Sequence, residues 1–380
     1  MSKILILHFH SHKTQPRAYR EYEALWGLYE LEGMGYERGD FEEVEFVTLK
    51  KPKWGLAKRL LQRFWLLLRQ YERVYWNLPQ VKQAIPVLHE RSFDLIIAHD
   101  AEAIPVALRY GKGAKVVANM HEYAPREFEH DFWWRFYFAP YKRYLCKRYL
   151  PKTRAVLAIG EGIAHEYQKN FGVNPKIWSN AAKYFEIKPA LASGSTIRLI
   201  HHGLANPDRQ IELMIEMMDH VDGRFRLDLM LVFVNSNKAY YQKLEKMARE
   251  RQNVRLIPPV APEEIVPFTN AYDIGLFLCP PTTFNLEFCL PNKFFEFIQA
   301  RLAIAIGPSP EMARIVQKEN LGIISQDFTP LSMARALNQL THEEILAYKQ
   351  NADRAAKIYN AKENEKILQG VIEKVLKEDQ

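Results

Sequence analysis

Leu290-Pro-Asn-Lys-Phe-Phe-Glu-Phe-Ile298 is the stretch of this sequence that says most about the fold. It follows a loop that comes directly after an apolar, strand-like run at 273–278. Pro291 falls in the first turn, where a helix tolerates proline. Phe294 and Ile298 share one face, which we expect to anchor the helix in a core. The stretch therefore predicts a strand, a loop and the start of a helix.

The polar residues of the same stretch suit a nucleotide diphosphate. Free N–H groups at a helix start attract phosphate, and Lys293 adds a mobile positive charge there. Asn292 and Glu296 are four residues apart and share a helix face. The Glu296 carboxylate can accept two hydrogen bonds from a vicinal diol such as a ribose. An ordinary amphipathic helix with a surface lysine and glutamate fits the same pattern.

This stretch resembles the LPNK-x-x-E-[YF] segment of many family-4 glycosyltransferases of the GT-B fold. In that family the segment carries the second glutamate of a Glu-x7-Glu motif, which holds the ribose of the sugar nucleotide. The resemblance implies this role for Glu296. The first glutamate would fall at Phe288, so Glu287, one residue earlier, becomes the candidate sugar contact. The family tends to continue with Ala-Gly, where this chain has Ala300-Arg301.

A second segment, 198–212, resembles the opening of the C-terminal domain in the same family. The resemblance implies that Gly203 lets the backbone approach a phosphate. It places Arg209 at the phosphate-binding lysine of the family, where a guanidinium can clamp a diphosphate. Leu204 stands where the family has an arginine, so Lys293 is the second cation that we expect to contact the diphosphate.

Two strand ends in the first half also resemble family segments. Residues 116–122 resemble the strand followed by His-Glu, whose histidine lies near the donor sugar, so His121 is expected to contact the sugar or orient a proton. A lone histidine can also be structural. Residues 94–100 resemble a strand that ends in His-Asp on the acceptor side. The acceptor-side candidates are His99, Asp100 and Glu122.

Short apolar strands alternate with helices along the whole chain, which predicts parallel sheets with helices on both faces. The resemblance implies an α/β protein of the GT-B fold, with two Rossmann-like parallel-sheet domains facing a central cleft. Ligands in such folds bind at the carboxyl ends of the strands. The predicted strands are 3–7, 44–48, 94–98, 115–118 and 155–159, then 198–201, 227–234, 253–257, 273–278, 302–306 and 322–324. Among the predicted helices are 17–31, 102–109, 209–218, 238–251 and 292–300.

The polar run 188–196 is the expected linker between the two domains. It separates an acceptor- and membrane-facing domain at 1–187 from a domain at 197–355 that binds the sugar nucleotide. By analogy with the GT-B fold, residues 356–380 are expected to form a helix that crosses back to the N-terminal domain.

Composition is that of a globular protein of about two domains: 380 residues, of which 48% are hydrophobic and 26% charged. Cys146, Cys279 and Cys289 form no C-x-x-C pair, which argues against a disulfide framework or a zinc site and fits a reducing cytosol. We see no long apolar signal region at the N-terminus and no apolar run near the length that spans a bilayer.

One segment accounts for the net charge of +7. Between Lys50 and Arg73 there are eight basic residues and one acid, an excess that equals that of the whole chain. The segment has helical periodicity and interleaves apolar residues with cations, as an interfacial helix on an anionic membrane does. A second basic-aromatic stretch at 132–149 contains no acid. The membrane candidates are Trp54, Lys58, Arg59, Arg63, Trp65, Trp133 and Trp134.

Two other interpretations of these stretches remain open. Both helices can bury their aromatic residues in a domain core and leave their charges in solvent. Nucleic-acid binding also uses basic-aromatic stretches, but no RNA- or DNA-binding motif accompanies them, so no nucleic-acid partner is expected.

No metal or cofactor is expected. The sequence has no D-x-D triad and no histidine-carboxylate group with metal-ligand spacing. It also lacks G-x-S-x-G, P-loop and G-x-G-x-x-G motifs. Arg209, Lys293 and helix N–H groups are the expected means of neutralising a departing diphosphate.

The sequence thus predicts a metal-independent glycosyltransferase of the hexosyltransferase type, with a nucleotide-diphosphate sugar as donor. The resemblance implies a retaining enzyme of the bacterial surface-polysaccharide type. The basic-aromatic stretches suggest a lipid-linked saccharide acceptor and a cytoplasmic, peripheral location on the inner face of the cell membrane. A nucleotide-sugar epimerase or hydrolase and a non-catalytic membrane scaffold are the alternatives. The oligomeric state is left open.

Overall fold

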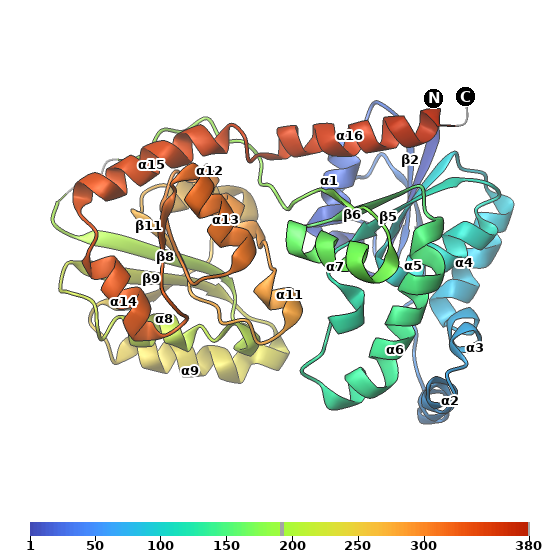
Figure 1. Ribbon diagram of the computed structural model, residues 1–380, viewed down its shortest axis with the longest axis horizontal. Helices are drawn as coiled ribbons and strands as arrows, with labels where there is room; N and C mark the ends of the chain where they lie inside the picture. The colour runs from blue at the N-terminus through green and yellow to red at the C-terminus, as the bar shows by residue number, and fades with distance from the viewer. Residues whose placement is uncertain (191–193, 379–380) are drawn as a thin grey trace. The chain divides into compact units, whose positions relative to one another are not determined.

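The computed structural model describes residues 1–190 and 194–378, and it divides into two compact units (Figure 1). Residues 191–193 of the expected linker lie outside the described residues. Unit 1 consists of Met1–Ser179, Thr283–Asn285 and the segment from Asn364 onward; unit 2 consists of Asn180–Thr282 and Leu286–Glu363.

Unit 1 is built on a seven-stranded parallel sheet with the order β3-β2-β1-β4-β5-β6-β7. The central strands are almost continuous apolar runs, as expected where helices cover both faces of a parallel sheet. The strands are β1 (Lys3–Leu7), β2 (Glu30–Gly35), β3 (Glu45–Thr48), β4 (Leu95–His99), β5 (Lys115–Met120), β6 (Ala155–Ala158) and β7 (Lys176–Ile177). The helices are α1 (Pro16–Leu25), α2 (Leu56–Leu67), α3 (Tyr71–Trp76), α4 (Pro79–Glu90), α5 (Asp100–Tyr110), α6 (Phe132–Tyr149), α7 (Glu161–Phe171) and most of α16 (Ala361–Lys377).

The strand order of unit 1 reverses between β1 and β4. In doubly wound sheets such a switch point opens a crevice beyond the carboxyl ends of the strands. His8 directly follows β1, His99 ends β4 and His121 directly follows β5. Three histidines from distant parts of the chain therefore reach the same edge of the sheet.

The predicted helix at 17–31 is wrong beyond Leu25, where α1 ends, and β2 was not predicted. Its Glu32 is completely buried and forms ion pairs with Arg91 and Lys3. Gly33 packs so closely that a Cβ atom there would lie 2.2 Å from Tyr22 Oη. The buried Glu32, the exposed Glu30 and two glycines give this strand few apolar residues, so it does not stand out as an apolar run.

The basic segment forms two helices, because the chain breaks between α2 and α3 at Arg69, whose φ is 54°. Tyr71 and Tyr75 are buried in α3. On α2 itself Leu66 is the buried residue. The leucines of α2 therefore face a different environment from the tyrosines of α3.

Unit 2 has a six-stranded parallel sheet with the order β10-β9-β8-β11-β12-β13, which reverses between β8 and β11. With unit 1 it confirms the predicted α/β class of two parallel-sheet domains. The strands are β8 (Ile197–Leu204), β9 (Phe225–Val232), β10 (Val254–Ile257), β11 (Ile274–Phe277), β12 (Ala303–Ile306) and β13 (Gly322–Ile324). The helices are α8 (Glu212–Met217), α9 (Lys238–Arg249), α10 (Ile265–Thr269), α11 (Phe284–Glu287, shared with unit 1), α12 (Asn292–Gln299), α13 (Pro310–Glu319), α14 (Pro330–Asn338) and α15 (His342–Ala356).

Neighbouring residues of the unit 2 strands enter different core clusters, since side chains alternate across a sheet. Leu199 packs in one cluster and Ile200 in the other. Phe294 and Ile298 of α12 are buried in the second cluster, which confirms the expected anchoring face of that helix. The packing fixes α12 with its N-terminus near the carboxyl ends of the strands.

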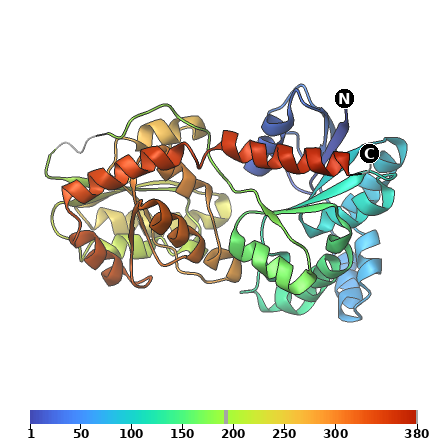
Figure 2. The same cartoon turned by 45° about the horizontal axis from the view of Figure 1, so that its top comes forward.

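Helix α16 completes the core of unit 1 (Figures 1 and 2). Leu368, Ile372 and Val375 are buried in the cluster that contains Ile4 and Ile6 of β1. Gln369 donates a hydrogen bond of 2.7 Å to the Ala24 carbonyl. One face of the sheet in unit 1 is therefore covered by a segment that follows unit 2 in the sequence.

Among residues 1–190 and 194–378, every helix is too short or too polar to cross a membrane.

Candidate active site

Lys293 and Arg209 converge at the carboxyl end of β8, within unit 2. A Cβ atom on Gly203 would lie 3.1 Å from Lys293 Nζ and 4.0 Å from Arg209 Nη1. Gly203 has a φ of 122°, which side-chain-bearing residues rarely adopt. Glycine at this position thus serves both the backbone turn and the close approach of the two cations.

Lys293 is only 5% exposed, so the expectation that it provides a mobile positive charge is wrong. His201 Nδ1 lies 2.9 Å from the Leu276 carbonyl and donates to it, which leaves Nε2 as an acceptor. Lys293 Nζ lies 3.1 Å from that Nε2 and donates to it. The ammonium group also lies 5.2 Å from the centre of the Phe277 ring. Packing around the four-carbon stem therefore fixes the charge in place.

Burial, and after it the charge of Arg209, lowers the pKa of Lys293 well below its ordinary value. A dianionic or trianionic group placed between the two cations would reverse this effect, because it stabilises the protonated form. The positively charged state of both Arg209 and Lys293 is therefore stabilised most when an anion is bound.

Glu296 lies on α12 one turn after Asn292, and both side chains are partly exposed. Glu296 Oε2 is 3.5 Å from His202 Nε2. Burial, and after it the Lys293 charge, lowers the pKa of His202 to about 3, so the ring is neutral and the contact is not an ion pair. Glu287 is partly exposed at the end of α11, where its backbone carbonyl accepts a hydrogen bond of 3.2 Å from Ser309.

The strand ends of unit 1 hold a hydrogen-bonded chain of buried side chains. Glu21 Oε2 lies 2.6 Å from His99 Nε2, and His99 Nδ1 lies 2.8 Å from His121 Nε2. Asn119 donates to the other Glu21 oxygen at 2.5 Å and accepts a bond of 2.8 Å from Arg17. Glu21 and His99 are completely shielded, whereas His121 is partly exposed. The chain of contacts holds His121 at the surface of unit 1.

His8 and Asp100 lie against this chain. The His8 ring stacks on His99 with 4.6 Å between ring centres, and Nε2 is 3.5 Å from Asp100 Oδ2. Burial lowers the pKa of His8 to about 4, and it lowers the pKa of His121 well below its ordinary value. Asp100 has a φ of 58°, an unfavourable backbone conformation that recurs at functional sites.

The structure thus brings His99, Asp100 and His121 together, as the strand-end rule predicts. Glu122 is an exposed residue, but its carboxylate accepts a hydrogen bond of 3.4 Å from Asn285, and burial raises its pKa to about 7. Its backbone carbonyl accepts a bond of 2.8 Å from Tyr167. The sequence analysis missed several polar residues at these strand ends. His8 follows the predicted strand 3–7 and His201 ends the predicted strand 198–201, so the same rule would have found both. Asn119 and His202 directly follow the predicted strands 115–118 and 198–201, so the same rule would have found them too, whereas Glu21 gave no comparable signal.

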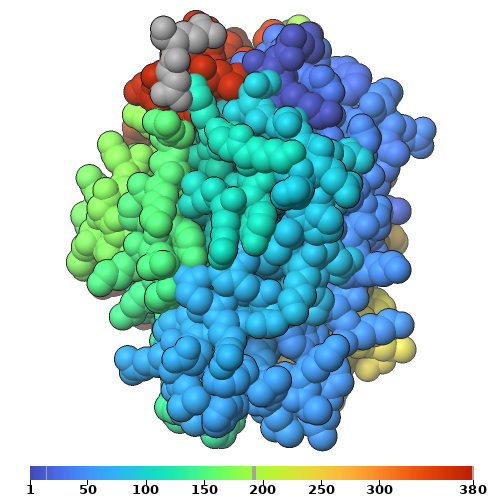
Figure 3. Space-filling model, turned by 90° about the vertical axis from the view of Figure 1, so that its right-hand side faces the viewer, coloured from blue at the N-terminus to red at the C-terminus, as the bar shows by residue number. Residues whose placement is uncertain are grey.

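Helix α2 and the first half of α6 expose many apolar and basic side chains, and together they are here called the basic-apolar surface. In Figure 3 the region of α2, in blue, covers the lower part of the face turned toward the viewer. Leu56 is 74% and Trp133 62% exposed. Trp65 is half-buried, and the Arg73 guanidinium lies 4.1 Å from its ring. The other exposed apolar residues are Leu60, Leu61, Phe64, Leu67, Leu68, Phe132 and Phe136, while Lys58, Arg59, Arg63 and Arg135 are exposed cations and Trp54 and Trp134 are partly exposed.

The second half of α6 behaves differently, since Tyr141 and Leu145 are buried in unit 1. Core packing, one of the two open interpretations, therefore holds for this half of the helix.

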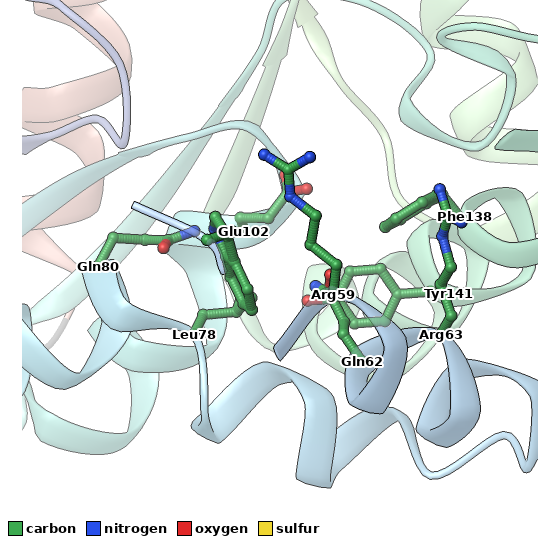
Figure 4. A pocket seen from close by; sticks show the side chains of 9 residues that line it. Arg59, Gln62, Arg63, Leu78, Gln80, Glu102, Phe138 and Tyr141 are labelled. Atoms are coloured by element: carbon green, nitrogen blue, oxygen red, sulfur yellow. The ribbon is translucent and has the colours of Figure 1, made fainter. Parts of the chain in front are cut away.

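A pocket of about 340 Å³ lies within unit 1 beside the basic-apolar surface (Figure 4). Arg59 and Arg63, one turn apart on α2, line it together with Trp54 and Phe138. Glu102 is also part of the wall, and its carboxylate forms an ion pair of 2.5 Å with Lys142. Lys142 is shared with Glu127, at 2.9 Å. With two arginines and one carboxylate in its wall, the pocket still carries a net positive charge.

Comparison with known proteins agrees with the two-unit fold. Residues 38–182, less than half of the chain, match the model of Glycosyltransferase Family 4. No curated protein matches the sequence. Among solved structures, HepE of Anabaena in complex with UDP and glucose has a TM-score of 0.71 at 13% identity, covering 98% of this chain and 100% of HepE.

Two further structures are similar over nearly the whole chain. Sucrose-phosphate synthase of Thermosynechococcus elongatus has a TM-score of 0.73 at 10% identity, with 99% of each chain covered. The UDP-forming trehalose-phosphate synthase of Burkholderia vietnamiensis has a TM-score of 0.70 at 13% identity, covering 100% of this chain and 98% of its own. These likenesses confirm the GT-B fold.

Proposed function

We propose that the chain is a retaining hexosyltransferase that moves a sugar from a nucleoside-diphosphate sugar to a lipid-linked saccharide. The observation that carries this proposal is the convergence of Arg209 and Lys293 at Gly203, beside the N-terminus of α12. Two fixed cations at a strand end suit the diphosphate of a sugar nucleotide, whose departure they would favour. Glu296, one turn into α12, is the proposed ribose ligand.

A UDP-sugar is the proposed donor. HepE was solved with UDP and glucose, and the trehalose-phosphate synthase is described as UDP-forming. Both share the fold of this chain over almost its full length. In the proposed reaction the C1–O bond to the diphosphate breaks while the acceptor oxygen bonds to C1 on the same face. The departing phosphate oxygen takes the acceptor proton, and the cation pair stabilises the negative charge on the diphosphate.

His121 is the proposed sugar contact in unit 1. Its partly exposed ring ends the buried chain that starts at Glu21, which fixes the ring orientation. His99 and Asp100 sit behind it, so their proposed role on the acceptor side is to position His121 and the strand ends. Glu122 is exposed and is the remaining acceptor-side candidate.

The proposed acceptor carries a lipid anchor, and the enzyme is proposed to work on the inner face of the cell membrane. The basic-apolar surface supports this, because exposed leucines and aromatic rings edged by cations bind anionic bilayers. The pocket beside it supports a phosphate-bearing headgroup, since Arg59 and Arg63 offer paired N–H donors. Assembly of surface polysaccharide is the proposed setting.

The donor proposal is tested by isothermal titration with UDP, GDP, ADP and CMP. One nucleotide, with UDP expected, should bind, and at 100 times its Kd it should stabilise the fold by about 2.7 kcal/mol. Glu296→Ala removes a charged hydrogen-bond acceptor; the loss of one such bond costs about 1.5–3 kcal/mol, so affinity should fall at least about 10- to 150-fold. Glu343→Ala, which changes an exposed glutamate on α15, is the matched control and should bind like the parent.

A second assay follows the sugar. Incubation with the UDP-sugar and a polyprenyl-diphosphate-linked saccharide should give a new glycoside whose anomeric configuration, read by NMR, equals that of the donor. Inversion would refute retention. Release of free sugar or its isomerisation, without a new glycoside, would replace transferase with hydrolase or epimerase. If no nucleotide binds to the folded protein, the remaining interpretation is a non-catalytic membrane scaffold.

A further inference from the structure

The three imidazoles at the strand ends of unit 1 have the arrangement of a metal centre. One nitrogen from each of His8, His99 and His121 lies within 4.8 Å of the other two. The three residues come from β1, β4 and β5, which are adjacent in the sheet. Three neighbouring strands of a rigid sheet therefore hold three of the commonest metal-binding side chains.

The hydrogen bonds of His99 leave the correct nitrogen facing the other rings. Its Nε2–H donates to Glu21, which makes Nδ1 the nitrogen with a lone pair. This is the orienting contact that metal-binding histidines usually receive from a carboxylate, and it fixes the tautomer of the ring. Glu21 is itself held by Asn119, so the support extends one residue further.

His8 gives an independent indication. The ring is 1% exposed, and among the described residues neither of its nitrogens has a hydrogen-bond partner. The contact with Asp100, at 3.5 Å, is at the outer limit of a hydrogen bond. Buried polar groups are nearly always satisfied, so a histidine of this kind requires an explanation. By contrast, His12 nearby is bonded through both nitrogens, to Tyr22 and Met34.

We propose that His8, His99 and His121 bind one divalent transition-metal ion of the zinc class, with a fourth position open to solvent on the side of His121. Three imidazoles and one open position are a ligand set of catalytic zinc sites. Tetrahedral coordination needs ligand nitrogens about 3.3 Å apart. His99 Nδ1 and His121 Nε2, 2.8 Å apart here, therefore separate when the ion binds, and the His8 ring turns from its stacked position on His99 so that a nitrogen lone pair faces the ion. His121 then carries its proton on Nδ1 in place of Nε2, and no net proton is released.

This inference goes beyond the proposed transfer reaction, because it rests on contacts within unit 1 alone. In the metal-bound state the open coordination position takes the place of the His121 N–H as the group that meets a substrate oxygen. Sequence spacing gave no sign of this site, since the ligands are separated by 91 and 22 residues along the chain.

The test uses the full chain, stripped with a chelator and titrated calorimetrically with ZnCl₂, with Co²⁺ absorption as a second readout. One ion per chain should bind, and Co²⁺ should show the visible absorption of a tetrahedral site. His8→Leu should abolish binding while keeping or raising thermal stability, because no hydrogen bond of the ring is lost. Glu21→Gln should weaken affinity about 10- to 100-fold.

His89→Leu, an exposed histidine on α4, is the matched control and should bind zinc like the parent. His121→Gln, at a partly exposed position, provides a second ligand variant in case His8→Leu misfolds. Absence of stoichiometric zinc binding by the folded parent, or full binding by either ligand variant, would overturn the inference. UDP binding is measured on the same samples, so a failure of the metal site is distinguished from a failure of the donor site.

Discussion

Neutralising the cations of α2 should release the protein from anionic membranes. Lys58, Arg59 and Arg63 are exposed on a helix that also exposes Leu56 and Phe64. In the triple variant with glutamine at all three positions, the apolar residues are unchanged and the charge falls by three. The variant therefore isolates the electrostatic part of membrane binding.

The size of the effect follows from the number of cations. A lysine or arginine close to an anionic bilayer contributes about 1 kcal/mol. Three of them contribute about 3 kcal/mol, which corresponds to a loss of about 150-fold in the partition coefficient. The same interaction is screened by salt, so the parent should also lose most of this advantage at high ionic strength.

Flotation with vesicles of neutral lipid, with and without phosphatidylglycerol, measures the partition coefficients of the parent and of the variant. The matched control replaces Lys238, Lys246 and Arg249 by glutamine, because these are exposed cations on α9 of unit 2. The control should bind vesicles like the parent. If the α2 variant stays within about twofold of the parent, or if the control loses as much, the basic-apolar surface is not the membrane contact.

Three further predictions concern the donor site and the core. Gly203→Ala forces a side-chain-bearing residue to a φ of 122° and against Lys293, so urea denaturation should show a loss of about 1–3 kcal/mol and nucleotide affinity should fall. Nucleotide binding should be accompanied by the uptake of a proton. At a pH above its lowered pKa the Lys293 amine of the free protein is neutral, and a bound diphosphate favours its protonation. Affinity should therefore fall as the pH rises toward 10.5, the ordinary pKa of a lysine. Titrations in buffers of different ionisation enthalpy will show this uptake, and Lys293→Gln should remove it; heats that do not vary with the buffer would contradict it. Leu368→Ala, on the buried face of α16, should lower the free energy of unfolding by about 2–5 kcal/mol, measured by chemical denaturation. Ile367→Ala, at an exposed position of the same helix, should lower it far less.

Much of the fold could be predicted from the sequence because most of the strands are buried on both faces. Such strands must be apolar throughout, as β1 and β4 are, and they stand out between helices. Strand β2 escaped because its buried glutamate is neutralised by partners that come from other parts of the chain. The sequence shows the glutamate but not the arginine at 91 that folds onto it.

Position 301 illustrates a second limit. The family that the sequence resembles tends to have glycine there, whereas this chain has an arginine. Arg301 has a φ of 58°, a conformation that glycine adopts without strain. It is completely buried and donates hydrogen bonds to Asp353 and to the Phe185 carbonyl. These bonds offset the backbone strain. Arginine in place of glycine therefore serves the packing of unit 2, and no local sequence pattern could reveal this.

The resemblance marked Lys293 at a predicted helix start and His121 at a predicted strand end, and the structure places each among polar side chains. The strand-end rule can mark a residue such as His201, but the partner that gives it a role is visible only in the fold. His201 holds the ammonium of Lys293, and Glu21 orients the histidines, although each is far from its partner in sequence. Roles that depend on a neighbour across the sheet cannot be assigned from spacing alone.

The position of α16 has a consequence for the order of folding during synthesis. Proteins with several domains generally fold from the N-terminus as the chain emerges from the ribosome. Here Leu368, Ile372 and Val375 fill part of the core around β1, yet they are synthesised after all of unit 2. The first sheet must therefore wait, with an apolar face uncovered, until the second unit has been made. A nascent chain arrested before α16 should thus be a good substrate for chaperones, and release of the helix should end that dependence.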